Sequence, residues 1–275
     1  MKMLQDIESQ GKLISELLIL KKKILQEYLG EAKIKKEIEE EIYYDFFLYD
    51  RLLRKYSCKR NGAIYLGGHK GEMLLALVLL GFKKILVIEP QPELFQQLQE
   101  KITVINQLLS YYDTLVEGQP TTSIEIFHTA VGAVDGEAEL YMTSESQLTS
   151  LFKPKEAIIN EETIYSQVKV NETIKVPLQT IDTIIEKSSG EISDFDFLYM
   201  NIQGGELKAL EGAKQTLPQL QAIYLEQNLI PRYEACPEAV EIDKCLIDRN
   251  FTKVWRYTLE SHGVSYDWYI NRIGV

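Results

Sequence analysis

The segment "AIYLGGHKGEMLLALVLLGFKKILVIEP", which spans Ala63–Pro90, combines two apolar runs, a glycine-rich bend and an apolar run of helix length. It ends in an acid followed by proline. This order is typical of a strand, a tight turn, a helix and a second strand. Repeated units of this kind build a mostly parallel sheet with helices on both faces. We therefore expect an α/β protein with a doubly wound sheet, and a ligand that needs both the bend and the acid.

The same alternation continues downstream of this segment. We expect further strands at 123–130, 135–142, 168–178, 195–200 and 222–225, and a closing antiparallel pair at 251–257 and 266–271. Asn171 is expected to form a turn within one of these extended stretches. Helices are expected at 72–80, 92–109, 206–212 and 237–249.

The residues before this region have a different character. Between Lys12 and Tyr56 there is no proline and one glycine, Gly30. Ile34, Ile38 and Ile42 recur four apart, which places them on one face of a helix. We expect a helical N-terminal extension over residues 1–57, followed by the main domain over residues 58–275. The extension is interpreted as packing on the main domain, pairing two copies as a homodimer, or covering a substrate site.

Composition excludes several classes of function. The formal net charge of −11 over 275 residues argues against a nucleic-acid partner, because phosphate backbones need clustered Lys and Arg. The three scattered cysteines indicate neither a disulfide framework nor a zinc site. No run approaches the ~20 apolar residues of a membrane span, and the first residues lack the apolar core of a signal peptide. We expect a cytoplasmic protein.

The glycine bend distinguishes between cofactors. A dinucleotide fingerprint, G-x-G-x-x-G, would place its first glycine at position 66, which is Leu66. The remaining spacing is G-x-x-x-G from Gly67 to Gly71, which is typical of S-adenosylmethionine-dependent methyltransferases. We expect Gly67 and Gly68 to let the backbone approach the ligand, and Gly71 to let the next helix pack closely. An NAD-dependent oxidoreductase is the less favoured interpretation.

Glu89 ends the second strand of this unit, and Pro90 stops that strand because proline has no N–H for the ladder. A carboxylate at this place accepts hydrogen bonds from the hydroxyls of a ribose. We therefore predict that Glu89, with Pro90 beside it, binds the ribose of the cofactor.

Five later stretches read FHTAVGAVDGEAELYM (127–142), LTSLFKP (148–154), VPLQTIDTII (176–185), DFDFLYMNIQGGELKALEGA (194–213) and IYLEQN (223–228). In this order, with Glu89 and Pro90 upstream, they resemble the FkbM family of S-adenosylmethionine-dependent methyltransferases. The resemblance covers about Ala63 to Arg272. It implies a class I methyltransferase fold with a seven-stranded, Rossmann-like sheet. It also implies S-adenosyl-L-methionine as cofactor and methyl transfer to a hydroxyl of a sugar or natural-product-like small molecule.

The chain departs from the pattern of this family at two motifs. The family's first motif usually reads D-x-G-x-N-x-G, and here Tyr65 and His69 take the places of Asp and Asn. Asn201 takes the place of an Asp in the later motif. Two carboxylates are thereby missing near the expected methionine end of the cofactor, where they would hold an ammonium. A catalytically silent binding or assembly module is therefore the alternative interpretation.

Candidate residues for the chemistry follow the strands at their carboxyl ends. Glu226 is expected near the acceptor, and Asn201 near the methionine moiety of the cofactor. His262 is a candidate base, because imidazole titrates near neutrality. His69 is expected to contact the cofactor or fill the bend, and Thr129 and Ala130 to contact the adenine. No spacing predicts a metal site, and neither a G-x-S-x-G elbow nor a P-loop is present.

Overall fold

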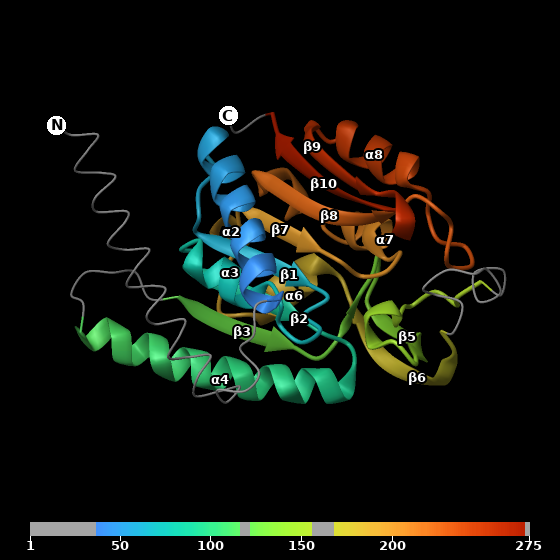
Figure 1. Ribbon diagram of the computed structural model, residues 1–275, viewed down its shortest axis with the longest axis horizontal. Helices are drawn as coiled ribbons and strands as arrows, with labels where there is room; N and C mark the ends of the chain where they lie inside the picture. The colour runs from blue at the N-terminus through green and yellow to red at the C-terminus, as the bar shows by residue number, and fades with distance from the viewer. Residues whose placement is uncertain (1–36, 116–121, 156–167, 273–275) are drawn as a thin grey trace.

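The computed structural model describes residues 37–115, 122–155 and 168–272, and its centre is a twisted seven-stranded sheet (Figure 1). The strand order is β3-β2-β1-β7-β8-β10-β9. Neighbouring strands from β3 to β8 pair in parallel, whereas β10 is antiparallel to both β8 and β9. The doubly wound, mostly parallel sheet that the sequence predicts is confirmed. The bounds are β1 (Gly62–Leu66), β2 (Lys84–Ile88), β3 (Ser123–Phe127), β7 (Phe197–Met200), β8 (Ala222–Asn228), β9 (Phe251–Leu259) and β10 (Val264–Asn271).

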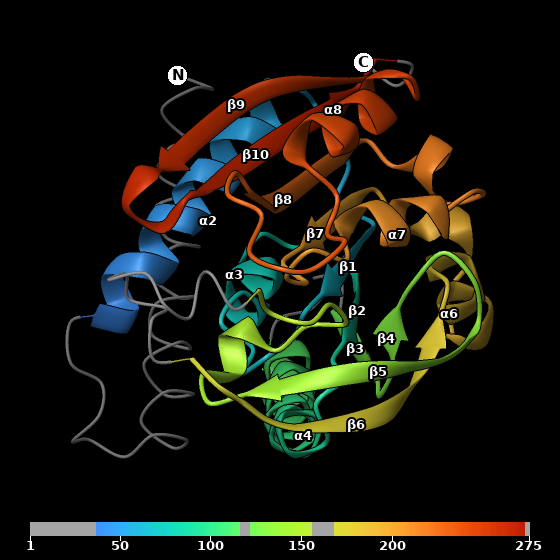
Figure 2. The ribbon, with the colours of Figure 1, turned by 90° about the vertical axis from the view of Figure 1, so that its right-hand side faces the viewer.

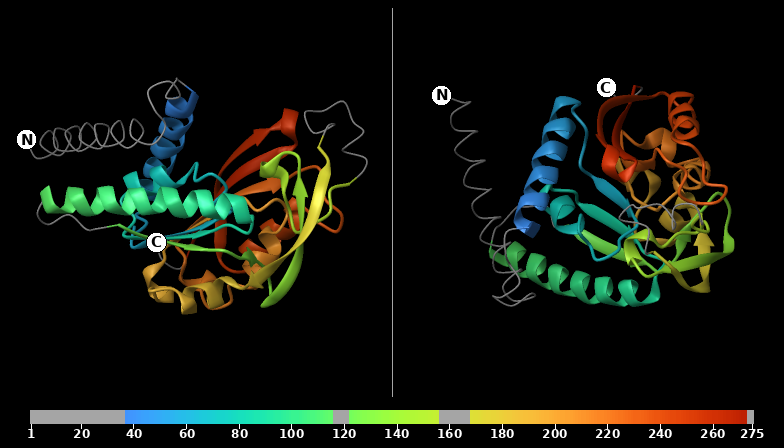
Figure 3. Two further views of the ribbon diagram at one scale, coloured as in Figure 1. Left: turned by 90° about the horizontal axis from the view of Figure 1, so that it is seen from below. Right: turned by 45° about the vertical axis from the view of Figure 1, so that its right-hand side comes forward.

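Helices cover both faces of this sheet, and Figure 3 shows the two groups on opposite sides of the strands. One apolar core lies beneath α2 (Glu37–Lys55), α3 (Leu74–Leu79) and α4 (Pro92–Leu115). The other lies beneath α6 (Ile181–Lys187), α7 (Glu206–Glu211) and α8 (Ala239–Ile247). The central strands are buried on both faces, which explains why β1, β2 and β7 read as continuous apolar runs rather than alternating ones.

A second, three-stranded sheet lies at the carboxyl edge of the first. Its strands are β4 (Ala130–Val131), β5 (Gly136–Thr143) and β6 (Val170–Gln179), in the order β4-β6-β5. In Figure 2 the strands β5 and β6 cross in front of the large sheet. This small sheet carries the segment that covers the functional site described below.

The structure differs from the sequence prediction in three respects. The extended stretch 123–130 is divided between β3 and β4, which belong to different sheets. Asn171 does not form a turn: it lies within β6, where the pairing with β5 shifts register, so it occupies a bulge. Helix α6 was not predicted, because its pattern over seven residues is too short to show a helical period. The helices predicted before residue 37 lie outside the described residues.

Helix α2 packs directly on the main sheet. Tyr49, Leu52 and Leu53 are buried in the same core as the strands, and the Tyr49 ring lies 4.9 Å from that of Tyr224 and 5.1 Å from that of Trp268. The described part of the N-terminal region therefore contributes apolar side chains to the fold.

Candidate functional site

A cavity of about 480 Å³ opens at the carboxyl edge of the large sheet, between its strand ends and the small sheet. This volume is in the range of small-molecule sites, and the place is where doubly wound sheets bind ligands. Most of the predicted site residues line it. They are Gly67, His69, Glu89, Pro90, Thr129, Ala130, Asn201, Glu226 and His262. Gly68 and Gly71 are not among the lining residues.

The glycine bend after β1 is shaped by packing within the protein. Gly67 has a φ of +80°, and a Cβ there would lie 2.1 Å from the carbonyl oxygen of Asn201. A Cβ on Gly68 would meet the Val87 and Leu98 side chains, so this glycine makes room for the β2–α4 layer rather than for a ligand. Gly71 makes room for Leu98 of α4 in the same way. Only Gly67 of the three reaches the cavity.

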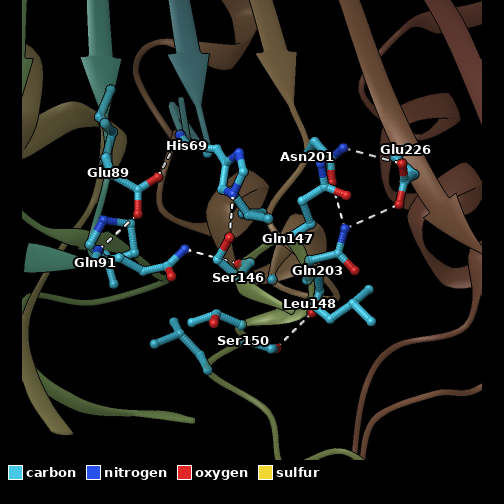
Figure 4. A pocket seen from close by; sticks show the side chains of 18 of the residues that line it. His69, Glu89, Gln91, Ser146, Gln147, Leu148, Ser150, Asn201, Gln203 and Glu226 are labelled. Atoms are coloured by element: carbon cyan, nitrogen blue, oxygen red, sulfur yellow. Dashed lines mark hydrogen bonds between the residues drawn. The ribbon is translucent and has the colours of Figure 1, made fainter. Parts of the chain in front are cut away.

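Glu89 closes one end of the cavity. Its carboxylate is 1% exposed and accepts the backbone N–H groups of His69, at 2.7 Å, and Gln91, at 2.8 Å. Burial raises the pKa of Glu89, and these backbone donors oppose that rise. The carboxylate is therefore fixed in orientation at the end of β2, where a ribose diol would be bound in folds of this type. Figure 4 shows Glu89 between His69 and Gln91.

Tyr65, which replaces the expected Asp, is part of the bend itself. Its hydroxyl donates to the carbonyl of Gly68 at 3.2 Å and accepts from the N–H of Met73 at 3.5 Å. Its ring packs edge-on against Tyr199, with centroids 5.0 Å apart. Tyr65 thus cross-links the bend to the start of the following helix without filling the cavity.

A cluster of two amides and one carboxylate forms the other end of the cavity (Figure 4). Asn201 and Gln203 follow β7, and Glu226 lies on β8. Asn201 Nδ2 donates to Glu226 Oε2 at 3.1 Å, and Gln203 Nε2 donates to Glu226 Oε1 at 3.1 Å. Gln203 Nε2 also donates to Asn201 Oδ1 at 2.7 Å. Each oxygen of the Glu226 carboxylate therefore receives an amide donor, so its orientation is fixed.

The electrostatic state of Glu226 follows from its burial. Desolvation raises its pKa above the usual value, whereas hydrogen bonds from Gln203, Tyr266 and Asn201 and the charge of Arg232 oppose the rise. Gln203 is held in turn by the hydroxyl of Tyr233, which donates to Oε1 at 2.9 Å. The result is a half-buried carboxylate whose pKa is raised above that of an exposed glutamate.

His262 lines the same end of the cavity from the turn between β9 and β10. Its Nδ1 lies 2.9 Å from the hydroxyl of Ser261, and the side chain is half-buried. Thr129 and Ala130 lie at the opposite end, where β3 passes into β4. Thr129 is buried and donates its hydroxyl to the carbonyl of Pro177 at 3.0 Å. The structure therefore brings predicted site residues from both ends into one cavity.

Sequence reasoning missed the cover of the cavity. Seven consecutive residues, Glu145–Leu151, line it and are termed the roof segment. They include the short 3₁₀ helix Ser146–Leu148. Only the stretch 148–154 was noticed, as part of a family resemblance, since the roof segment has no regular hydrophobic period. Tyr233 and Arg232 were missed for the same reason.

Glu206 is buried but does not line the cavity. Its carboxylate accepts the N–H of Ile202 at 3.1 Å and so closes the turn that precedes α7. Burial raises the pKa of Glu206 to about 7.

The charges around the cavity suit a cationic ligand. Among the described lining residues, the carboxylates of Glu72, Glu89, Glu145 and Glu226 face one arginine, Arg232, and no lysine. S-adenosylmethionine carries a sulfonium and an ammonium, so this donor set fits it. Within 37–115, 122–155 and 168–272, no group of three or more His, Cys, Asp or Glu side chains is placed to hold a metal ion.

The strand order, with one antiparallel strand next to the edge, together with the bend after β1 and the acid after β2, defines a class I methyltransferase. A family model described as "Methyltransferase FkbM domain" matches residues 66–254, which is more than half of the chain. The chain belongs to this family of methyltransferases.

Several solved structures are similar to the chain at low sequence identity. Magnesium protoporphyrin IX methyltransferase from Synechocystis PCC 6803, solved with bound S-adenosylmethionine, is 9% identical over 90% of each chain, with a TM-score of 0.41. A provisionally assigned O-methyltransferase from Klebsiella pneumoniae is 10% identical over 90% of this chain and 96% of that one, with a TM-score of 0.42. No significant match was found among curated proteins. In the described part of the chain, no helix is long and apolar enough to cross a membrane.

Proposed function

We propose that this protein is an S-adenosylmethionine-dependent O-methyltransferase that acts on a hydroxyl group of a sugar or natural-product-like small molecule. The observation that carries the proposal is the arrangement of two carboxylates, the buried Glu89 and the half-buried Glu226, at opposite ends of one cavity. The first stands where a ribose would be bound, and the second where an acceptor would meet the methyl group.

The cofactor half of the site consists of the bend and the end of β2. Gly67 and the backbone of His69 would lie against the cofactor, Glu89 would accept its ribose hydroxyls, and Thr129 and Ala130 would border its adenine. When bound, S-adenosylmethionine supplies a methyl group activated by its sulfonium. The chain contributes by excluding water and by holding the acceptor in line with that group.

The acceptor half provides the base. Glu226 would take the proton of an acceptor hydroxyl, so that the oxygen gains the nucleophilic lone pair for attack on the methyl carbon. Asn201 and Gln203 hold the two carboxylate oxygens and thereby orient the base. His262 lies at the rim of this half, where it would contact the acceptor.

Calorimetry with S-adenosylhomocysteine tests the cofactor half. Replacing Glu89 with Gln removes a charged acceptor from the ribose position, so Kd should rise about tenfold or more. The matched control is Glu93→Gln, an exposed acid on α4, which should bind as the wild type does. Equal affinity of wild type and Glu89→Gln would contradict the assignment of the ribose site. Transfer of a labelled methyl group to small metabolites in an extract would then identify the acceptor.

A catalytically silent binding or assembly module is the second candidate. The observation that favours it is the neutral character of Tyr65 and Asn201, which stand where carboxylates are usual in the resembling family. Such a module would show no heat and no thermal shift with millimolar S-adenosylmethionine or S-adenosylhomocysteine. The proposed pairing of two copies concerns N-terminal helices that lie mostly outside the described residues.

A further inference from the structure

His69 connects three parts of the site at once. It has a φ of +43° in the left-handed region, and its backbone N–H is bound to Glu89. Its ring nitrogen Nδ1 lies 2.6 Å from Glu72 Oε1, and Nε2 lies 2.8 Å from Ser146 Oγ. Both ring nitrogens therefore have protein partners, and Figure 4 shows the ring directed toward Ser146.

The carboxylate of Glu72 fixes the role of each nitrogen. Since Glu72 accepts a hydrogen bond, Nδ1 carries the proton, and Nε2 of the neutral ring accepts from the hydroxyl of Ser146. If the ring is protonated, Nε2 donates to the same oxygen instead. The contact between His69 and the roof segment is kept in either state.

The roof segment is hydrogen-bonded, on both sides of the cavity, to segments that follow strands of the large sheet. On the cofactor side, Ser146 contacts His69, and its carbonyl accepts from Gln91 Nε2 at 3.1 Å. On the acceptor side, Ser150 donates its hydroxyl to the carbonyl of Gln203 at 2.7 Å, and the Tyr233 hydroxyl oxygen lies 3.2 Å from the carbonyl oxygen of Leu148. These two sets of hydrogen bonds lie at opposite ends of the cavity, so a ligand that fills the cavity would lie between them.

We infer that His69 is a positioning residue, which acts on the cofactor by holding the roof segment closed through Ser146. The inference rests on the proposed function, because it concerns the same cavity. It replaces the expectation of a cofactor contact through the ring. An Asn at this position, as in the resembling family, would tolerate the left-handed backbone but is too short to bridge Glu72 and Ser146.

Hydrogen exchange of the ligand-free protein tests the fastening without any cofactor. His69→Asn and Ser146→Ala should both speed exchange of the amides in residues 145–151. Ser144→Ala is the matched control, because Ser144 lies just outside the roof segment and accepts from the N–H of Lys169 instead. Unchanged exchange in the two site variants would overturn the inference, even for a protein that binds no cofactor.

A double-mutant cycle on S-adenosylhomocysteine affinity tests the route of the effect. Each single variant should raise Kd about fivefold, in line with the loss of one hydrogen bond, and the double variant should raise it no further. The inference would be overturned if the two effects on Kd were additive. It would also be overturned if His69→Asn weakened S-adenosylhomocysteine binding while Ser146→Ala left it unchanged, because either result would indicate a direct contact between His69 and the cofactor. A wild type that binds no S-adenosylhomocysteine would contradict the proposed function, whereas the exchange experiment would still decide the role of His69.

Discussion

At the scale of single residues, the chemistry of this site depends on how amides are paired with a carboxylate. Asn201 and Gln203 both donate to Glu226. A carboxylate in place of either amide would repel the Glu226 carboxylate, whereas the amides leave one acid in the cluster. Because the amides donate to the ionised form, they favour the carboxylate that burial disfavours. The departure at Asn201 thereby becomes a means of orienting the Glu226 carboxylate.

Replacing Glu226 with Gln should lower the methyl-transfer rate about 100-fold or more, because the variant has no base. Affinity for S-adenosylhomocysteine should stay within about twofold of wild type. In the wild type, the rate should fall as pH decreases through the raised pKa of Glu226, since the protonated form cannot accept a proton. The pH profile of kcat/KM measures this, and an undiminished rate in the variant would refute the role of Glu226.

Glu206 should make stability depend on pH. In the folded protein burial raises its pKa to about 7, from 4.5 in an exposed chain, so the native state binds more protons than the unfolded state between these values. Stability is then greatest below the unfolded pKa and decreases as pH rises toward 7. From pH 5 to pH 8, the free energy of unfolding of Glu206→Gln should rise by about 2 kcal/mol relative to that of the wild type, because the variant has no carboxyl group to ionise. Urea denaturation at both pH values measures the difference, and parallel behaviour of the two proteins would contradict the assignment.

At the scale of elements, the bend after β1 joins the ends of three strands. The N–H groups of Gly67 and Gly68 both donate to the carbonyl of Ile88, and Asn201 N–H donates to the carbonyl of Leu66. The bend is therefore bonded to the ends of β2 and β7. Gly67 and Gly68 were predicted to let the backbone approach the ligand, but their tight contacts are with the protein itself.

Gly67→Ala should destabilise the fold by at least about 2 kcal/mol, because the added Cβ meets the Asn201 carbonyl at 2.1 Å in a left-handed backbone. Gly136→Ala is the control, since nothing lies within 4 Å of its Cβ and its φ is not positive. That variant should be neutral or slightly more stable. Chemical denaturation compares the two, and equal stabilities would show that the bend tolerates a side chain.

At the scale of the whole molecule, the N-terminal region and the sheet share a core. Leu53 and Tyr49 of α2 are fully buried, and Tyr49 packs on aromatic rings from β8 and β10. The division into a helical extension over residues 1–57 and a main domain over residues 58–275 remains a proposal. Residues 37–55 already supply part of the core on which the strands depend.

Leu53→Ala should therefore destabilise the protein by about 2–5 kcal/mol, the cost of a cavity in a core. Arg51→Ala, on the exposed side of the same helix, should change stability by no more than about 0.5 kcal/mol. Thermal and urea unfolding of both variants measures this. A neutral Leu53→Ala would mean that α2 folds apart from the sheet.

The sequence by itself determined the class of fold, the order of most strands and helices, and the position of Glu89 directly after the second strand. These features are recorded locally, in hydrophobic period, glycine spacing and strand-terminating residues. The sequence placed Glu226 after a strand that ends at Leu225, whereas β8 continues to Asn228. The roof segment, the pairing of Asn201 and Gln203 with Glu226, and the packing of α2 were decided by tertiary structure. His69 meets Ser146 across 77 positions of the chain. Such a contact depends on how two sheets lie against each other, and no local pattern encodes that.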